Sequence, residues 1–284
     1  MNIMTKSILF VLSLATLLAT TACSSRLQQK SVDASNLTAF PHERFDKVTQ
    51  ANVDDTGRVD YTAVKANSDD LEYFTGAVAS AGPTLAPNLH PDGDHGLAYY
   101  INGYNSLAML NVLSLYPGMT DLNSIAKQAS FFVFTKVVVD GKEINLKDLE
   151  NDVIRPNALK HYQSQKKVSK LGRIHFALNC ASVGCPQLPS EAFTPEKLEE
   201  QLDRETNKFV REKRNVSVDH KNKVVTLNKI FEWYAVDFTD DAGNTISQLK
   251  WINYYLGDDE KVPENYAVQF RDYDWNLNDQ ALAK

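Results

Sequence analysis

The segment over residues 97–116 constrains the fold most, because it is apolar on almost every side of a helix. A helix at a protein surface carries one apolar stripe and one polar face. Here apolar or aromatic side chains occur all round the helical turn, and Pro117-Gly118 ends the run. Such a helix has to be enclosed by other parts of the chain. The pattern is produced by Leu97, Tyr100, Ile101, Tyr104, Leu107, Leu110, Val112 and Leu113.

Two amides lie inside this apolar segment. Asn102 and Asn105 are three residues apart and therefore share one face of the helix. A buried amide is costly unless it is hydrogen-bonded, so the pair predicts a polar network in the core. Two interpretations stay open. In the first, the amides fix neighbouring loops by bonding to their backbone. In the second, one amide orients a catalytic group or donates to an oxyanion.

The rest of the chain mixes helical patterns with hairpins. Asn145 and Thr194 each precede a helical segment as an N-cap residue. Turns at Asp140-Gly141 and near Lys221-Asn222 separate β-branched runs, the pattern of a β-hairpin. Residues 173–179 are typical of an extended strand. We therefore expect an α+β fold in which an antiparallel sheet packs against the buried central helix.

The stretch RIHFALNCASVGCP, residues 173–186, gathers the most reactive side chains. Four interpretations of His175, Cys180 and Cys185 stay open. The cysteines form a disulfide, or Cys180 is a nucleophile with His175 as its base, or all three bind a metal, or all three are inert. The spacing matches no standard zinc motif, and a pair of thiols in an oxidising compartment tends to form a disulfide.

The charged residues give weaker signals. Glu150 and Arg155, five residues apart in LENDVIRP, are expected to form an ion pair at a helix end. The chain has 30 Lys and Arg against 36 Asp and Glu, a formal net charge of −6. A nucleic-acid partner requires clustered positive charge, so we expect none.

The N-terminus is typical of a bacterial lipoprotein signal. Lys6 precedes an apolar run from Ile8 to Ala19, which is too short to span a bilayer comfortably. The small residues and cysteine of TTAC follow this run. We therefore expect residues 1–22 to be a signal peptide and Cys23 to be lipidated.

The lipid would then be the membrane anchor of an otherwise water-exposed protein. We expect residues 23–40 to form the anchor and linker, followed by a single domain over residues 41–284. Ser24 after the cysteine suggests transport to the outer membrane. The expected location is the cell envelope, with the domain facing the periplasm.

Four blocks of the sequence together resemble the DUF547 family, a domain family without an assigned function. They are YYINGYNSLAMLNVLSLYP, INLKDLENDVIRP, RIHFALNCASVGCPQLPSEAFTPEKLEEQLDRETNKFV and LNKIFEWYAVDF. The resemblance extends over roughly residues 50–275. Its relatives include cytoplasmic proteins, which favours an active site over a purely structural disulfide. It implies that the signature blocks include Asn102, Tyr104, Asn105, Glu150, Arg155, His175, Asn179, Cys180, Cys185 and Pro186.

The expected helix on an antiparallel sheet is similar to the papain-like and transglutaminase-like architecture. We therefore expect a thiol-dependent hydrolase or acyltransferase with Cys180, His175 and Asn102 as catalytic residues. No cofactor and no metal is expected. The alternative is a non-catalytic lipoprotein with a Cys180–Cys185 disulfide that binds a peptide, a glycan or a protein. The expected binding residues are Tyr104, Asn105, Glu150, Arg155, Asn179 and Cys185.

Overall fold

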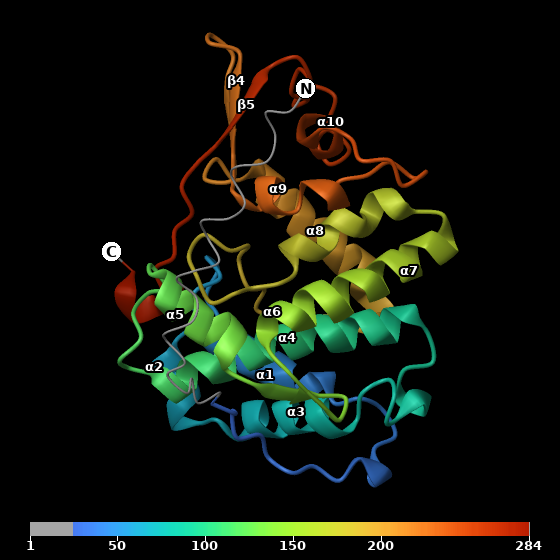
Figure 1. The fold of residues 1–284 in the computed structure, drawn as a ribbon, viewed down its shortest axis with the longest axis vertical. Coiled ribbons are helices and arrows are strands. Elements are labelled where there is room, and N and C mark those ends of the chain that lie inside the picture. The colour runs from blue at the N-terminus through green and yellow to red at the C-terminus, as the bar shows by residue number, and fades with distance from the viewer. Residues whose placement is uncertain (1–24, 284) are drawn as a thin grey trace, which may run out of the picture.

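Helix α4 (Gly93–Leu115) is buried on nearly all sides, as the sequence predicts. In the computed structural model, which describes residues 25–283, α1 (His42–Asn52), α3 (Asp69–Ser80) and α7 (Arg155–Gln165) pack around it (Figure 1). The carboxylate of Asp92 caps α4 by accepting a hydrogen bond from the backbone N–H of His95. A helix that is apolar on every side excludes water only at such a central position.

Within residues 25–283 the β-structure is smaller than expected, with one two-stranded and one three-stranded sheet. Strands β1 (Val137–Val139) and β2 (Lys142–Ile144) form one hairpin, and β3 (Val216–Asp219) and β4 (Val224–Leu227) form the other. Strand β5 (Ala267–Phe270) adds to β4 in parallel, at one end of the molecule (Figure 1). Both predicted hairpins are confirmed. The predicted packing of an antiparallel sheet on the central helix is wrong, because helices enclose α4. The fold is mixed α+β and mostly helical.

Residues 173–179 do not form the predicted strand. They belong to the 3-10 helix η5 (Val168–Phe176) and the loop that follows it. Helices α7 and α8 (Leu198–Arg211) both pack against η5, and residues 171–179 are all buried. A segment between helices has no neighbouring strand for its backbone groups, so it bonds locally instead. The papain-like and transglutaminase-like arrangement, with histidine on a strand, is therefore absent from this segment.

The remaining elements are short. Asn145 caps α6 by accepting from the backbone N–H of Asp148, as predicted, whereas the Thr194 side chain caps nothing although a helix follows it. The short elements of the chain are η1 (Ala34–Asn36), α2 (Tyr61–Ala66), η2 (Pro87–Leu89), α5 (Ile125–Ala129), η3 (Ser130–Phe134), α6 (Leu146–Asp148), η4 (Leu149–Ile154), η6 (Pro195–Lys197), α9 (Ile230–Trp233), η7 (Ala235–Asp237), α10 (Gln248–Ile252) and η8 (Gln280–Leu282).

Apolar side chains form two cores that meet at η5. Ile174 belongs to the larger core around α4, whereas Phe176 belongs to the smaller core with Phe231 and Trp251. After β5 the chain returns along one side of the molecule to the larger core, where Leu277 is fully buried (Figure 1). Segments distant in sequence therefore meet at the junction of the two cores.

Residues 25–40, part of the expected anchor and linker, lie along the domain. The Gln29 amide bonds to both the backbone N–H and the carbonyl of Val138, at the free edge of β1. Val32 and Phe40 are buried in the larger core. Unpaired strand groups and apolar anchors explain this docking. No helix within residues 25–283 is long and apolar enough to cross a membrane.

Candidate functional site

A pocket of about 520 Å³ opens at the junction of the two cores. Its walls come from α4, α5, η3, η4, α9, the C-terminal segment and the end of η5 with its following loop. A concave, mostly apolar pocket with a few converging polar groups is the usual form of a ligand site. The polar and sulfur-bearing side chains that the sequence singled out and that line this pocket are Tyr104, Glu150, His175, Cys180 and Cys185.

Aromatic rings form one wall of the pocket. The rings of Trp233, Tyr273 and Trp275 lie with their centroids 4.5–5.8 Å apart, and 45% of the Trp233 surface is exposed. Such rings offer large flat surfaces to an apolar or ring-shaped ligand. No sequence motif indicates this wall, because its residues come from two segments about 40 positions apart.

His175 is held by a buried carboxylate at the base of the pocket. Its Nε2 lies 2.8 Å from Oδ2 of Asp237, and Nε of Arg155 donates to the same oxygen at 2.7 Å. Burial alone raises the pKa of Asp237, but the hydrogen bonds from His175 and Arg155 lower it to about 2. An ionised carboxylate only accepts hydrogen bonds, so Nε2 of His175 carries a proton. The ring of Tyr234 stacks on the imidazole with centroids 3.9 Å apart.

The second ring nitrogen of His175 has no hydrogen-bond partner among the described residues. This atom, Nδ1, is buried and lies 4.0 Å from Oε1 of Glu150, which is beyond hydrogen-bonding distance. Burial, and then the Glu150 carboxylate, raise the pKa of the Tyr104 and Tyr234 hydroxyls well above the usual value. With Nε2 protonated, neutral His175 offers an acceptor at Nδ1 next to the Glu150 carboxylate.

Cys180 and Cys185 are joined by a disulfide, so the disulfide interpretation is the one that the structure supports. Their Cα atoms lie 6.2 Å apart. Ala181 adopts a positive φ of 63°, and this turn directs the chain back so that both cysteines reach the same pocket as His175. Neither sulfur is a free nucleophile in this state.

Asn105 and Asn179 fix the loop that carries the disulfide. The Asn105 amide donates to the carbonyl of Ala177 and accepts from the backbone N–H of Asn179. The Asn179 side chain in turn bonds to Pro186 O and to the N–H of Ala181. The Asn105 amide thus bonds to loop backbone, in line with the first of the two interpretations of the helical amides.

Asn102 lies away from the pocket. Its side chain donates to the carbonyl of Phe193 at 2.7 Å and accepts from the N–H of the same residue at 3.0 Å. Its amide nitrogen also lies 2.9 Å from Nδ1 of His42. Burial, and then nearby histidines, lower the pKa of His42 to about 3, so this imidazole is neutral at pH 7. The structure does not bring Asn102 together with His175 and Cys180.

The predicted ion pair between Glu150 and Arg155 does not form. The Arg155 guanidinium bonds to Asp237 and to Asn151, whereas Glu150 faces His175. Sequence reasoning missed Asp237, the carboxylate that links Arg155 to His175. Asp237 lies in the block LNKIFEWYAVDF, so a search of the quoted blocks for an acidic partner of His175 would have found it.

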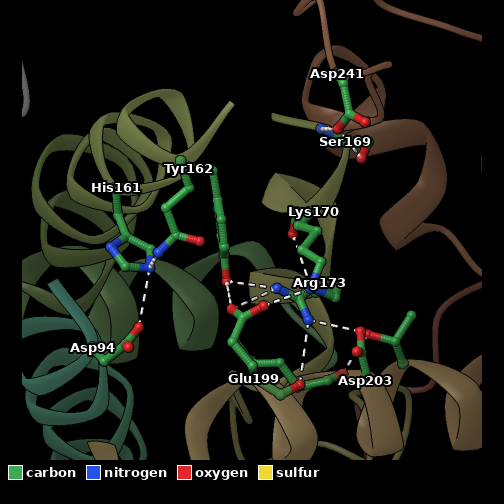
Figure 2. Close-up of polar contacts among 12 residues, drawn as sticks. Asp94, His161, Tyr162, Ser169, Lys170, Arg173, Glu199, Asp203 and Asp241 are labelled. Carbon is green, nitrogen blue, oxygen red and sulfur yellow. Dashed lines mark hydrogen bonds and ion pairs between the residues drawn. The ribbon is translucent and has the colours of Figure 1, made fainter. Parts of the chain in front are cut away.

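The Arg173 side chain anchors η5 two residues before His175. It is fully buried and donates to Tyr162, Glu199 and Asp203 on α7 and α8 (Figure 2). Burial opposes the charge, but the surrounding oxygens raise the pKa of Arg173 above its usual value. A buried guanidinium with several acceptors holds its helix in one position. The anchor therefore positions His175 at the pocket.

A second group of side chains lies next to this anchor. One ligand atom each of Asp94, His161 and Glu199 fall within 4.8 Å of one another (Figure 2). Glu199 is already bonded to Lys170 and Arg173, and His161 Nε2 lies 3.1 Å from Asp94. Because Lys170 and Arg173 already pair with the Glu199 carboxylate, their positive charges disfavour a metal ion bound there.

The predicted lipidation site, Cys23, lies outside the described residues. The comparison with protein families matches residues 90–210 to the family described as "Protein of unknown function, DUF547". This match is shorter than the expected resemblance over roughly residues 50–275, and it excludes Asp237 and the aromatic wall. No curated protein and no solved structure matches the chain. The chain therefore carries a DUF547 domain at residues 90–210.

Proposed function

We propose that this protein binds an amphipathic ligand, such as a peptide segment, in the pocket at the junction of its two cores. The apolar part of the ligand packs against the aromatic wall formed by Trp233, Tyr273 and Trp275. A hydroxyl, amide or ammonium group of the ligand donates to Nδ1 of His175 and to Glu150. This function is the binding alternative of the sequence analysis.

The single observation that carries the proposal is the unpartnered Nδ1 of His175. A buried nitrogen without a partner costs about 1–3 kcal/mol. His175 is 3% exposed and lies in the pocket wall, so a ligand in the pocket is well situated to supply the missing bond. The nearby Glu150 carboxylate favours a donor over an acceptor at this position.

We propose further that the protein is a cell-envelope lipoprotein, anchored to the outer membrane through Cys23 and facing the periplasm. The apolar run and TTAC sequence of its N-terminus support this location. A disulfide in the domain is consistent with an oxidising compartment. The ligand would then come from the envelope, as a peptide, glycan or protein segment.

The binding proposal can be tested with two N-acetylated dipeptide amides, Phe-Ser and Phe-Asp, using saturation-transfer NMR. We expect Phe-Ser to bind and Phe-Asp to bind more weakly, because its carboxylate is repelled by Glu150. The variant H175A should weaken Phe-Ser binding about 3- to 10-fold, the effect of one hydrogen bond. W233A should weaken Phe-Ser binding more than H175A does.

The matched control is H220A, because His220 is exposed at the β3–β4 hairpin, far in the chain from the pocket residues, and bonds to Tyr266. This variant should bind Phe-Ser as the wild type does. Binding that is equal in the wild type, H175A and W233A would contradict the proposal, as would a preference for Phe-Asp.

Thiol-dependent hydrolase or acyltransferase chemistry is a second candidate, restricted to the reduced chain. The observation that favours it is that Cys180 and His175 line the same pocket. The nucleophile would be the Cys180 thiolate, with His175 as the base held by Asp237. In the oxidised chain this nucleophile is not available, so we rank binding first.

A further inference from the structure

The two cysteines of the disulfide differ in how far they are exposed. Both cysteines line the pocket, but Cys185 is 4% exposed whereas Cys180 is partly exposed. Thiol–disulfide exchange begins with a thiolate that attacks one sulfur in line with the S–S bond. A ligand thiol in the pocket therefore reaches Cys180 before Cys185.

The buried sulfur already lies among hydrogen-bond donors. The backbone N–H of Cys180 donates to Sγ of Cys185 at 2.9 Å, and the Tyr273 hydroxyl donates to the same sulfur at 3.0 Å. The Sγ of Cys180 contacts the hydroxyls of Ser182 at 3.2 Å and Tyr273 at 3.3 Å, but within residues 25–283 it has no backbone N–H donor. Burial raises the pKa of Tyr273, so its hydroxyl keeps its proton. A disulfide sulfur is only a weak acceptor. Both donors therefore stabilise Cys185 more as a thiolate than as part of the disulfide.

A base lies in the same pocket wall. Nδ1 of His175 has no hydrogen-bond partner among residues 25–283, and its Nε2–H is held by Asp237. A carboxylate in this position stabilises the imidazolium that forms when Nδ1 takes a proton. The pocket thus combines an accessible disulfide sulfur, a stabilised leaving sulfur and a base.

We propose that the Cys180–Cys185 disulfide oxidises a dithiol ligand by thiol–disulfide exchange. The proposal rests on the proposed ligand pocket and identifies the donor group of the ligand as a thiol. The apolar walls favour a dithiol peptide with an aromatic or aliphatic residue beside its cysteines.

The reaction proceeds in two exchanges. The first ligand thiol gives its proton to His175, and its sulfur bonds to Cys180 Sγ. The Cys180–Cys185 bond breaks and Cys185 leaves with the electron pair as a thiolate. The second ligand thiol, as a thiolate, attacks the ligand sulfur of this mixed disulfide and releases the Cys180 thiolate. The ligand dithiol loses two electrons and two protons, and the chain disulfide gains them as two thiols.

The activity can be measured with the N-acetylated peptide amide Cys-Phe-Gly-Cys and the oxidised full chain, by following peptide oxidation with mass spectrometry. We expect one peptide disulfide per chain, formed at pH 7 at least about tenfold faster than with oxidised glutathione at equal concentration. H175A should be about tenfold slower or more at pH 7. This deficit should shrink at pH 9, where the peptide thiol ionises without a base.

Two further variants give readouts that a merely structural role would not change. C185S, reacted with the peptide disulfide, should trap a mixed disulfide at Cys180. The apparent pKa of the Cys185 thiol can be measured in reduced C180S from the rate of iodoacetamide labelling as the pH is varied. The double variant C180S/Y273F should show a higher pKa than C180S. H220A is the matched control and should oxidise the peptide at the wild-type rate.

Oxidation of the peptide no faster than with oxidised glutathione overturns the proposal. A pH-independent effect of H175A also overturns the role of His175 as the base. The same peptide with S-methylated cysteines separates this failure from failure of the binding proposal. If the methylated peptide binds but the dithiol peptide is not oxidised, the binding proposal holds and the thiol–disulfide exchange proposal is wrong. If the methylated peptide does not bind and the dithiol peptide is not oxidised, both proposals are wrong.

Discussion

At the scale of single residues, the carboxylate of Asp237 has the widest effect on the site. It accepts hydrogen bonds from Arg155 and His175 through one oxygen, and only 10% of its side chain is exposed. Removing one member of a buried charged network leaves the others without compensation. Asp237 therefore fixes both the proton on His175 and the position of Arg155.

The change D237N is expected to destabilise the protein by about 2–4 kcal/mol at pH 7, measured by urea unfolding. The folded-state pKa of about 2 lies below that of an unfolded Asp. The stabilisation is therefore complete above about pH 4 and is lost as the pH falls towards 2.

The difference in the free energy of unfolding between D237N and the wild type should therefore decrease between pH 4 and pH 2. D258N is the control, because Asp258 is 97% exposed in its pair with Lys261, and we expect it to leave the urea midpoint unchanged. If the free energies of unfolding of D237N and the wild type differ equally at pH 7 and pH 2.5, ionisation of Asp237 is not the cause of the stabilisation.

At the scale of elements, η5 is the segment that decides whether the pocket forms. Its buried Arg173 bonds to groups on α7 and α8 (Figure 2). Its last residues belong to two different cores. Asn105 on α4 then holds the loop that follows it. Three helices thus determine the path of one short segment, and that path places His175 and the disulfide in the same wall.

The change R173A is expected to cost about 3–5 kcal/mol of stability, because Glu199 and Asp203 lose the buried cation between them. The measurement is urea unfolding, with Phe-Ser binding as a second readout of the pocket. R211A is the matched control, since the Arg211–Glu260 pair is exposed and its loss should cost at most about 1 kcal/mol. Similar losses in both variants would contradict an anchoring role for Arg173.

At the scale of the whole molecule, the N-terminal segment determines where the proposed lipid anchor would join the domain. The carbonyl of Ser25 accepts from the backbone N–H of Lys136, and residues up to Phe40 lie along the larger core. Two residues span about 7 Å, so a lipid on Cys23 would keep the η3 side of the domain at the bilayer surface.

The change C23S tests the anchor. The wild-type protein should sediment with the outer membrane, and its N-terminal peptide should carry acyl chains by mass spectrometry. The variant should lack these chains and be recovered in the soluble periplasmic fraction, because a lipid is the proposed link to the bilayer. Its unfolding midpoint should match that of the wild type with the lipid removed. Membrane sedimentation of C23S would contradict lipid anchoring.

The sequence alone determined the features that depend on neighbouring residues. The apolar run of α4, the two hairpins and the Asn145 cap follow from local patterns, and all were predicted correctly. The same local reasoning identified the stretch of residues 173–186, whose His175, Cys180 and Cys185 line the pocket. The spacing left a disulfide, a thiol site and a metal site all open.

Only the tertiary structure decided how these residues are used. The pattern of residues 173–179 resembles a strand, but α7 and α8 pack against this segment and it becomes the 3-10 helix η5 and a loop. Arg155 bonds to Asp237, 82 residues away, and not to its neighbour Glu150. Aromatic residues from two distant segments close the pocket. The physical reason is that burial and hydrogen bonding act between groups close in space, whereas spacing reports only groups close in the chain.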